Sequence, residues 1–149
     1  MSAKFKKYLE SNDLSKVMTE AIGEAYKTLC TAVNVKDFDD IHICEKIVAN
    51  RREFFSLWAF TDKIFCRIVI GKGTDTENKI VIFNIKGNII RIAITHYNFD
   101  LKNPTTDSNL EYTIKTQGMT VPYFLAASGL NCSNLTHVVN KYFLSDLIR

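Results

Sequence analysis

The sequence contains few residues that interrupt regular structure, with two prolines and six glycines among 149 residues. We find no internal repeat and no low-complexity segment. Hydrophobic residues make up 46% of the chain and charged residues 23%, a composition typical of folded globular domains that excludes the disordered class. A chain of this length can bury a substantial core. We therefore expect one domain, spanning residues 1–149.

Long apolar runs are also missing. The segment at residues 1–13 carries basic residues but no apolar stretch of the kind found in signal peptides. No apolar run approaches the ~18 residues that a membrane-spanning helix needs. We therefore expect no membrane partner and a cytoplasmic or nuclear location.

Paired cysteines of the CxxC type are absent, and the four cysteines are Cys30, Cys44, Cys66 and Cys132. Each lies among apolar neighbours, which favours buried, reduced thiols. A zinc site built from the His42–Cys44 and Cys132–His137 pairs would have atypical ligand spacing. Cys132 could pair with His96 or His137 as a nucleophile and base, but the sequence has no supporting acid motif. We expect no metal, no cofactor and no enzymatic activity, and keep a thiol-dependent enzyme as an alternative.

The feature that organises the chain is residues 53–97, which hold the only Trp and four runs rich in Ile, Val and Phe. β-Branched residues in alternation are typical of half-buried strands. The pattern predicts strands at 53–60, 64–71, 79–85 and 89–97, and a fifth strand at 110–116.

Helices are predicted on both sides of these strands. Apolar residues recur at spacings of three and four over 14–33, which indicates an amphipathic helix capped by Asn12 or Asp13. Residues 37–50 fit a helix or a strand, and we favour the helix. A short helix from Thr120 to Gly129 and a last helix capped by Ser133 follow. Residues 1–12 are expected as a loosely docked lead-in. The fold class is α+β, one antiparallel sheet of about five strands flanked by N-terminal and C-terminal helices.

The two predicted faces of this sheet differ in character. One face collects aliphatic residues and is the predicted core under the helix at 14–33. The other mixes aromatic, aliphatic and basic residues, including Phe65, Arg67, Phe83, Arg91, Tyr97, Thr113 and Lys115. A solvated face is usually more polar. The C-terminal helices, a second copy of the chain or a single nucleic acid strand could cover it.

The function that we favour is that of a non-enzymatic binding and assembly protein that forms a homodimer and engages a macromolecular partner. Apolar anchors for such contacts are predicted at Phe83, Tyr142 and Phe143. The alternative is binding of single-stranded RNA or DNA, in which aromatic rings stack on bases and cations neutralise phosphates. The residues predicted for that role are Arg51, Arg52, Phe65, Arg67, Phe83, Arg91 and Tyr97.

The net charge of +3 is mild and concentrates in the strand region. It is well short of the dense basic patches of dedicated duplex binders. The bias toward Ile, Lys and Asn is typical of AT-rich genes, which many viruses and protists have, and it makes a viral source one candidate.

Overall fold

The computed structural model describes residues 1–48, 51–70, 80–84, 89–97, 108–117 and 122–144. The element order is α1 (Ala3–Ser11), α2 (Lys16–Val33), β1 (Asp40–Val48), β2 (Arg51–Phe60), β3 (Ile64–Val69), β4 (Ile80–Asn84), β5 (Ile89–Tyr97), β6 (Asn109–Thr116), β7 (Tyr123–Ser128), α3 (Asn131–Val139) and a π-helical turn η1 (Asn140–Leu144). The α+β class is therefore confirmed. None of the helices within the described residues is long and apolar enough to cross a membrane.

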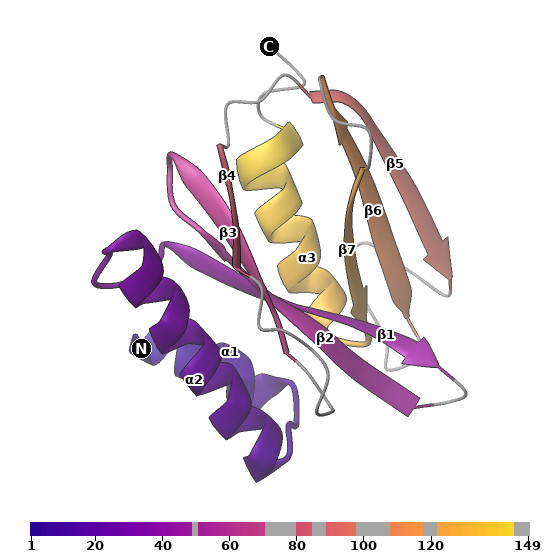
Figure 1. Ribbon diagram of the computed structural model, residues 1–149. Coiled ribbons are helices and arrows are strands. Elements are labelled where there is room, and N and C mark those ends of the chain that lie inside the picture. Colours follow the sequence, from indigo (N-terminus) through magenta and orange to yellow (C-terminus); the bar gives the residue numbers. More distant parts are fainter. Residues whose placement is uncertain (49–50, 71–79, 85–88, 98–107, 118–121, 145–149) are drawn as a thin grey trace.

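The strands form two antiparallel sheets, and the prediction of one five-stranded sheet was wrong. Sheet A has the order β1-β2-β3-β4, and sheet B has the order β5-β6-β7. Figure 1 shows α3 between the two sheets, and α1 and α2 on the opposite side of sheet A. Two strands that had been predicted as helices, β1 and β7, account for the larger number of strands.

The N-terminal region is more regular than predicted. Residues 3–11 form the helix α1, with Ser2 as its N-cap and with Phe5 and Leu9 buried. The helix predicted over 14–33 is confirmed as α2, but its N-cap is Ser15, whose side chain accepts a hydrogen bond from the Met18 amide. Asn12, one of the two predicted caps, instead ends α1.

The segment at 37–50 contains β1 and is not a helix, because the alternation of Ile41 and Ile43 with His42 and Cys44 suits a strand between two packed layers. Ile41 and Ile43 belong to the core under α1 and α2. His42 and Cys44 face sheet B and α3, where they bond to the backbone of β7.

The segment around 120–128 contains β7, so the prediction of a helix there was wrong. Gly129 has the predicted left-handed φ, at 59°, but it ends a strand. The last helix, α3, begins after Leu130 without a side-chain cap, so Ser133 is not its N-cap.

Two apolar cores lie on opposite faces of sheet A. The first contains Ile22, Ala25, Tyr26 and Leu29 of α2, packed on sheet residues such as Cys66 and Ile68. This confirms that the helix at 14–33 covers the aliphatic residues of sheet A. The prediction that aliphatic residues of β5 and β6 share that core was wrong, because Ile92, Leu110 and Ile114 pack into the second core.

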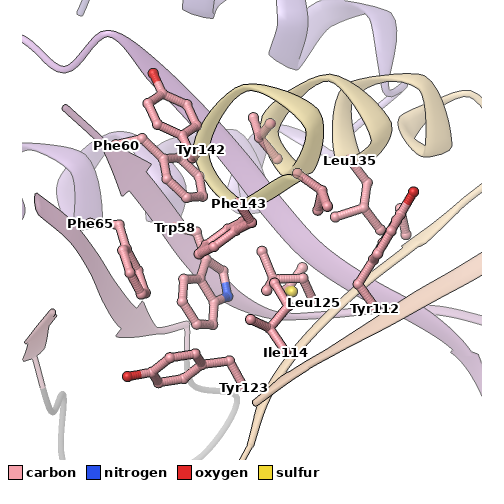
Figure 2. Packing of buried hydrophobic residues seen from close by; sticks show 14 of the residues in the cluster. Trp58, Phe60, Phe65, Tyr112, Ile114, Tyr123, Leu125, Leu135, Tyr142 and Phe143 are labelled. Atoms are coloured by element: carbon pink, nitrogen blue, oxygen red, sulfur yellow. The ribbon is translucent and has the colours of Figure 1, made fainter. Parts of the chain in front are cut away.

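The second core lies between sheet A, sheet B and the C-terminal helical segment, and it is rich in aromatic rings (Figure 2). The Phe60 and Tyr142 rings stack with centroids 4.7 Å apart. Phe65 meets Phe143 edge-on at 5.3 Å. The aromatic face predicted from the sequence is therefore covered, over these residues, by the chain's own α3, η1 and sheet B.

Candidate functional site: the outer face of sheet B

The candidate functional site lies on the side of sheet B that points away from the aromatic core. Strand alternation fixes which residues lie there, because Ile92, Ile114 and Leu125 pack into the core and their neighbours must point outward. We call this surface the outer face of sheet B, and its defining residues are Arg91, Ala93, Thr113, Lys115, Pro122 and Phe124.

Two cations stand opposite each other on this face. Arg91 and Lys115 are direct partners across β5 and β6, and both side chains are exposed. Like charges directly opposite in an antiparallel pair are destabilising. An anion placed between them would relieve that repulsion.

The aromatic ring of Phe124 lies on the same face as the two cations. Thr113 pairs with Ala93 on one side and with Phe124 on the other, so a row of three residues crosses the sheet beside the cations. Phe124 is 48% exposed. A hollow of about 270 Å³ lies here, lined by Arg91, Ala93, Thr113, Lys115 and Pro122. Among its described side chains the face thus offers two cations, one open aromatic surface around a small concavity, and the carboxylate of Glu111, which lies on the same side of β6 as Thr113.

Of the residues predicted for nucleic acid binding, Arg91 lies on this face, and Phe65 and Arg67 do not. Phe65 is only 2% exposed and is stacked with Trp58. The Arg67 guanidinium lies 5.7 Å from the centroid of a Trp58 ring. Phe65 and Arg67 therefore belong to the packed region between the sheets.

Four further predicted residues have backbone positions in strands, but their side chains lie outside the described part of the chain. Arg51 and Arg52 pair with Val48 and Ile47 in the β1–β2 ladder. Phe83 on β4 pairs with Phe65. Tyr97 on β5 pairs with Asn109.

The predicted interface residues Tyr142 and Phe143 are buried, with 5% and 1% exposure. Both belong to the aromatic core, where they contact Phe60. In this conformation their rings stabilise the fold, and a contact with another molecule would need other side chains.

The Tyr142 hydroxyl also takes part in a polar cluster around Asp40, whose side chain is 3% exposed. The carboxylate accepts hydrogen bonds from Lys4 Nζ at 2.9 Å, Lys141 Nζ at 2.7 Å and Tyr142 Oη at 2.6 Å, and His137 Nε2 lies 3.2 Å away. Burial alone would raise the pKa of Asp40, but these hydrogen bonds outweigh it and hold the pKa well below its usual range. The cluster joins α1, β1, α3 and η1.

His42 forms a second buried polar contact, which links β1 to α3 and β7. Its ring is fully buried, with Nδ1 3.1 Å from the Asn134 amide nitrogen and Nε2 3.1 Å from the Ala126 carbonyl. Asn134 Nδ2 donates to Nδ1 and Nε2–H donates to Ala126 if the imidazole is neutral. Burial lowers the pKa of His42 to about 4, so the neutral form is the stable one in the folded protein near neutral pH.

Of the cysteine and histidine pairs considered for nucleophilic chemistry, Cys132 and His137 are not brought together, and the His96 side chain lies outside the described part of the chain. Cys132 is buried near the Ser108 and Ala127 carbonyls, whereas His137 lies beside Asp40. Burial raises the pKa of the Cys44 and Cys66 thiols to about 12, which disfavours the nucleophilic thiolate. Within the described residues there is no group of three or more His, Cys, Asp or Glu side chains placed to hold a metal ion.

Phe124 and Pro122 are the members of the outer face that sequence analysis missed as surface residues, because the segment was assigned to a helix. The sequence nevertheless contains a pattern that fits a strand at this position. The run Tyr123–Ser128 is short, it is bounded by Pro122 and Gly129, and short apolar runs between such residues fit strands as well as helices.

No protein-family model matches the chain, and no curated protein sequence is significantly similar to it. Among solved structures, the chain is similar to a pleckstrin homology domain from Shewanella amazonensis SB2B. The sequences are 18% identical, the match covers 80% of this chain and 98% of that one, and the TM-score is 0.45.

Proposed function

We propose that this protein is a non-enzymatic binding protein that engages single-stranded nucleic acid through the outer face of sheet B. The observation that carries the proposal is the pairing of two exposed cations, Arg91 and Lys115, next to the exposed ring of Phe124. Base stacking on an aromatic ring combined with phosphate neutralisation is how open sheets bind single strands.

The shape of the face supports a single strand over a duplex. Its hollow of about 270 Å³ is small, and its described side chains include one exposed ring, two cations and the carboxylate of Glu111. A duplex keeps its bases stacked inside, where Phe124 could not reach them. A single strand can place one base on the ring while its phosphates lie along the cations.

Fluorescence anisotropy with a labelled, mixed-sequence single-stranded oligonucleotide tests this function. We expect binding that weakens as salt is raised, because released counterions supply part of the affinity. Arg91→Ala and Lys115→Ala should each weaken binding and flatten the logarithmic salt dependence by about 0.7 per lost phosphate contact. Phe124→Ala should weaken binding about tenfold and leave the salt dependence unchanged.

Lys16→Ala is the matched control, because it also removes one exposed lysine charge, but from α2. It should bind like the unmodified protein. If all four variants bind alike, the outer face is not the contact surface.

Self-association remains a prediction. The two anchors for it that the structure describes, Tyr142 and Phe143, are buried within the chain, so no specific observation favours it over nucleic acid binding.

A further inference from the structure

The carboxylate of Glu111 lies at the opposite end of the outer face of sheet B from the two cations. Glu111, Thr113 and Lys115 follow one another on the same side of β6, since alternate residues of a strand share a face. Each residue adds about 3.4 Å to a strand, so the Cα atoms of Glu111 and Lys115 are about 14 Å apart. A phosphate held by the cations is therefore kept away from the carboxylate.

Glu111 has no charged partner across the strands. The residues opposite it are Thr95 on β5 and Ala126 on β7. Within the described residues, its side chain forms no ion pair and no hydrogen bond. Glu111 is half-buried, so water reaches its carboxylate only in part. Because carboxylate oxygens accept hydrogen bonds and cannot donate them, this group is suited to a ligand that presents N–H donors.

The exposed ring of Phe124 lies next to this carboxylate. Phe124 pairs with Thr113, whereas Ala126 pairs with Glu111, so Phe124 and Glu111 are diagonal neighbours on β7 and β6. Diagonal neighbours are roughly 7–8 Å apart, a separation that aromatic and long side chains can span. A base stacked on Phe124 can therefore turn one edge toward Glu111, while its phosphates lie toward the cations.

The hydrogen-bonding pattern of the bases decides which base suits a carboxylate. The Watson–Crick edge of guanine carries N1–H and an exocyclic amino group side by side, and the two oxygens of one carboxylate can accept from both. Adenine and cytosine place an unprotonated ring nitrogen beside their amino group. Thymine and uracil place a carbonyl oxygen on each side of their N–H. These acceptors repel a carboxylate, so guanine is the favoured base.

We propose that Glu111 makes the outer face of sheet B select guanine in a single strand. The guanine ring stacks on Phe124, its Watson–Crick edge donates to Glu111, and its phosphates lie toward Arg91 and Lys115. Bases in single strands are free to be recognised through this edge. The inference rests on the proposed function, because a strand must first bind to this face.

Fluorescence anisotropy tests the base preference with labelled oligothymidylates that carry one central purine, which is guanine, hypoxanthine or adenine. Hypoxanthine matches guanine but lacks the exocyclic amino group, and all three purines offer a similar surface for stacking. We expect the guanine probe to bind about five- to tenfold more tightly than the adenine probe, with hypoxanthine between them. Equal affinities for guanine and hypoxanthine, or for guanine and adenine, would overturn the assignment.

Glu111→Gln tests the residue itself. The variant should bind the guanine probe about fivefold more weakly, but it should bind the adenine probe as well as before or slightly better, because a negative charge leaves the face. If Glu111 only repelled phosphates, its loss would tighten binding of every probe equally, and that result would overturn the proposal. Glu20→Gln is the matched control, since it removes an exposed carboxylate from α2, and it should leave all affinities unchanged.

Unlabelled guanosine monophosphate, used as a competitor, distinguishes a strand from a free nucleotide. We expect it to displace the guanine probe far less well than an unlabelled guanine-containing strand does. Equal displacement would overturn the strand as the ligand. Binding of all probes without a base preference would overturn only the role of Glu111, whereas no binding of any probe at low salt would contradict the proposed function as well.

Discussion

Single buried polar residues form hydrogen bonds that link helices and strands in this protein. His42 is an example, because its two ring nitrogens lie within hydrogen-bonding distance of α3 and of β7. From the sequence, His42 was considered only as a zinc ligand of atypical spacing, within a segment that fits a helix or a strand. Its role depends on Asn134 and Ala126, which lie more than eighty positions away along the chain, and local patterns do not report such partners.

The lowered pKa of His42 predicts that the protein loses stability as the pH falls from 6.5 toward 4. Its pKa falls from 6.5 to about 4 on folding, so only the unfolded chain takes up this proton between those values. The contribution of His42 to stability is fully present above pH 6.5 and is lost as the pH falls toward 4. It amounts to roughly 3 kcal/mol, since one pKa unit corresponds to about 1.4 kcal/mol.

Urea unfolding at pH 7, 5.5 and 4.5 measures this loss. His42→Gln should show a shallower decline over that range than the unmodified protein. If the unmodified protein and His42→Gln decline in parallel, His42 does not carry the effect.

The lowered pKa of Asp40 predicts a second loss of stability, at a lower pH than that of His42. Because its folded pKa is depressed, the stabilisation that it provides is present above its unfolded pKa of about 3.8 and is lost as the pH falls further. Asp40→Asn should destabilise the protein by about 2–4 kcal/mol at pH 7, since the variant loses charge-assisted hydrogen bonds at a buried position. Asp39→Asn is the control, because that neighbouring residue is exposed.

Thermal unfolding of both variants at pH 7 and at pH 3 gives the comparison. The stability gap between Asp40→Asn and the unmodified protein should narrow at pH 3. A gap that is small at pH 7, or independent of pH, would mean that the Asp40 cluster contributes little.

At the scale of elements, side chains cover the outer edges of two strands. The outer edge of β1 is bonded by Tyr8, Asn131 and Asn134, which contact the Ile43 amide and the Ile43 and Ile41 carbonyls. The outer edge of β7 is bonded by His42, Cys44 and Glu45. Exposed strand edges invite pairing with other chains, so these two edges are protected.

The edge of β1 gives a prediction for Asn131. Its side chain donates to the Ile43 carbonyl at 2.8 Å and accepts from the Tyr8 hydroxyl. Asn131→Ala should destabilise the protein by about 1–3 kcal/mol, because it leaves buried polar groups unpaired. It should also speed hydrogen exchange at the Ile43 amide, which donates to Tyr8.

Ser133→Ala is a suitable comparison, because Ser133 is an exposed residue of the same helix. It should change neither quantity appreciably. Equal exchange rates at the Ile43 amide in the two variants would show that Asn131 does not hold this edge.

The helices and strands also show which parts of the secondary structure can be predicted from local sequence patterns. Long periodic segments such as α2, and runs rich in β-branched residues such as β3 and β5, were predicted correctly. β1 and β7 were assigned to helices because short apolar runs fit both periods. Strand pairing with distant residues decided the outcome, and local sequence does not contain that information.

At the scale of the whole molecule, the sequence separated an aliphatic face from an aromatic and basic one, and neither face kept its predicted extent. The aliphatic residues of sheet A lie under α2, whereas those of β5 and β6 pack into the aromatic core. The aromatic and basic set divides in the structure between the two sheets. Phe65 and Arg67 lie between the sheets, whereas Arg91 and Lys115 point outward. The division arises because β5 begins a second sheet, which alternation within each strand cannot reveal.

The proposed function follows from this division, since the outer face of sheet B keeps both its cations and an exposed ring. The proposed function is tested by the affinity of Arg91→Ala and Lys16→Ala for a labelled single-stranded oligonucleotide at low and high salt. We predict salt-sensitive binding that Arg91→Ala weakens and that Lys16→Ala leaves intact. Salt-independent binding, no binding at low salt, or equal affinity for the two variants would rule out nucleic acid binding by the outer face of sheet B.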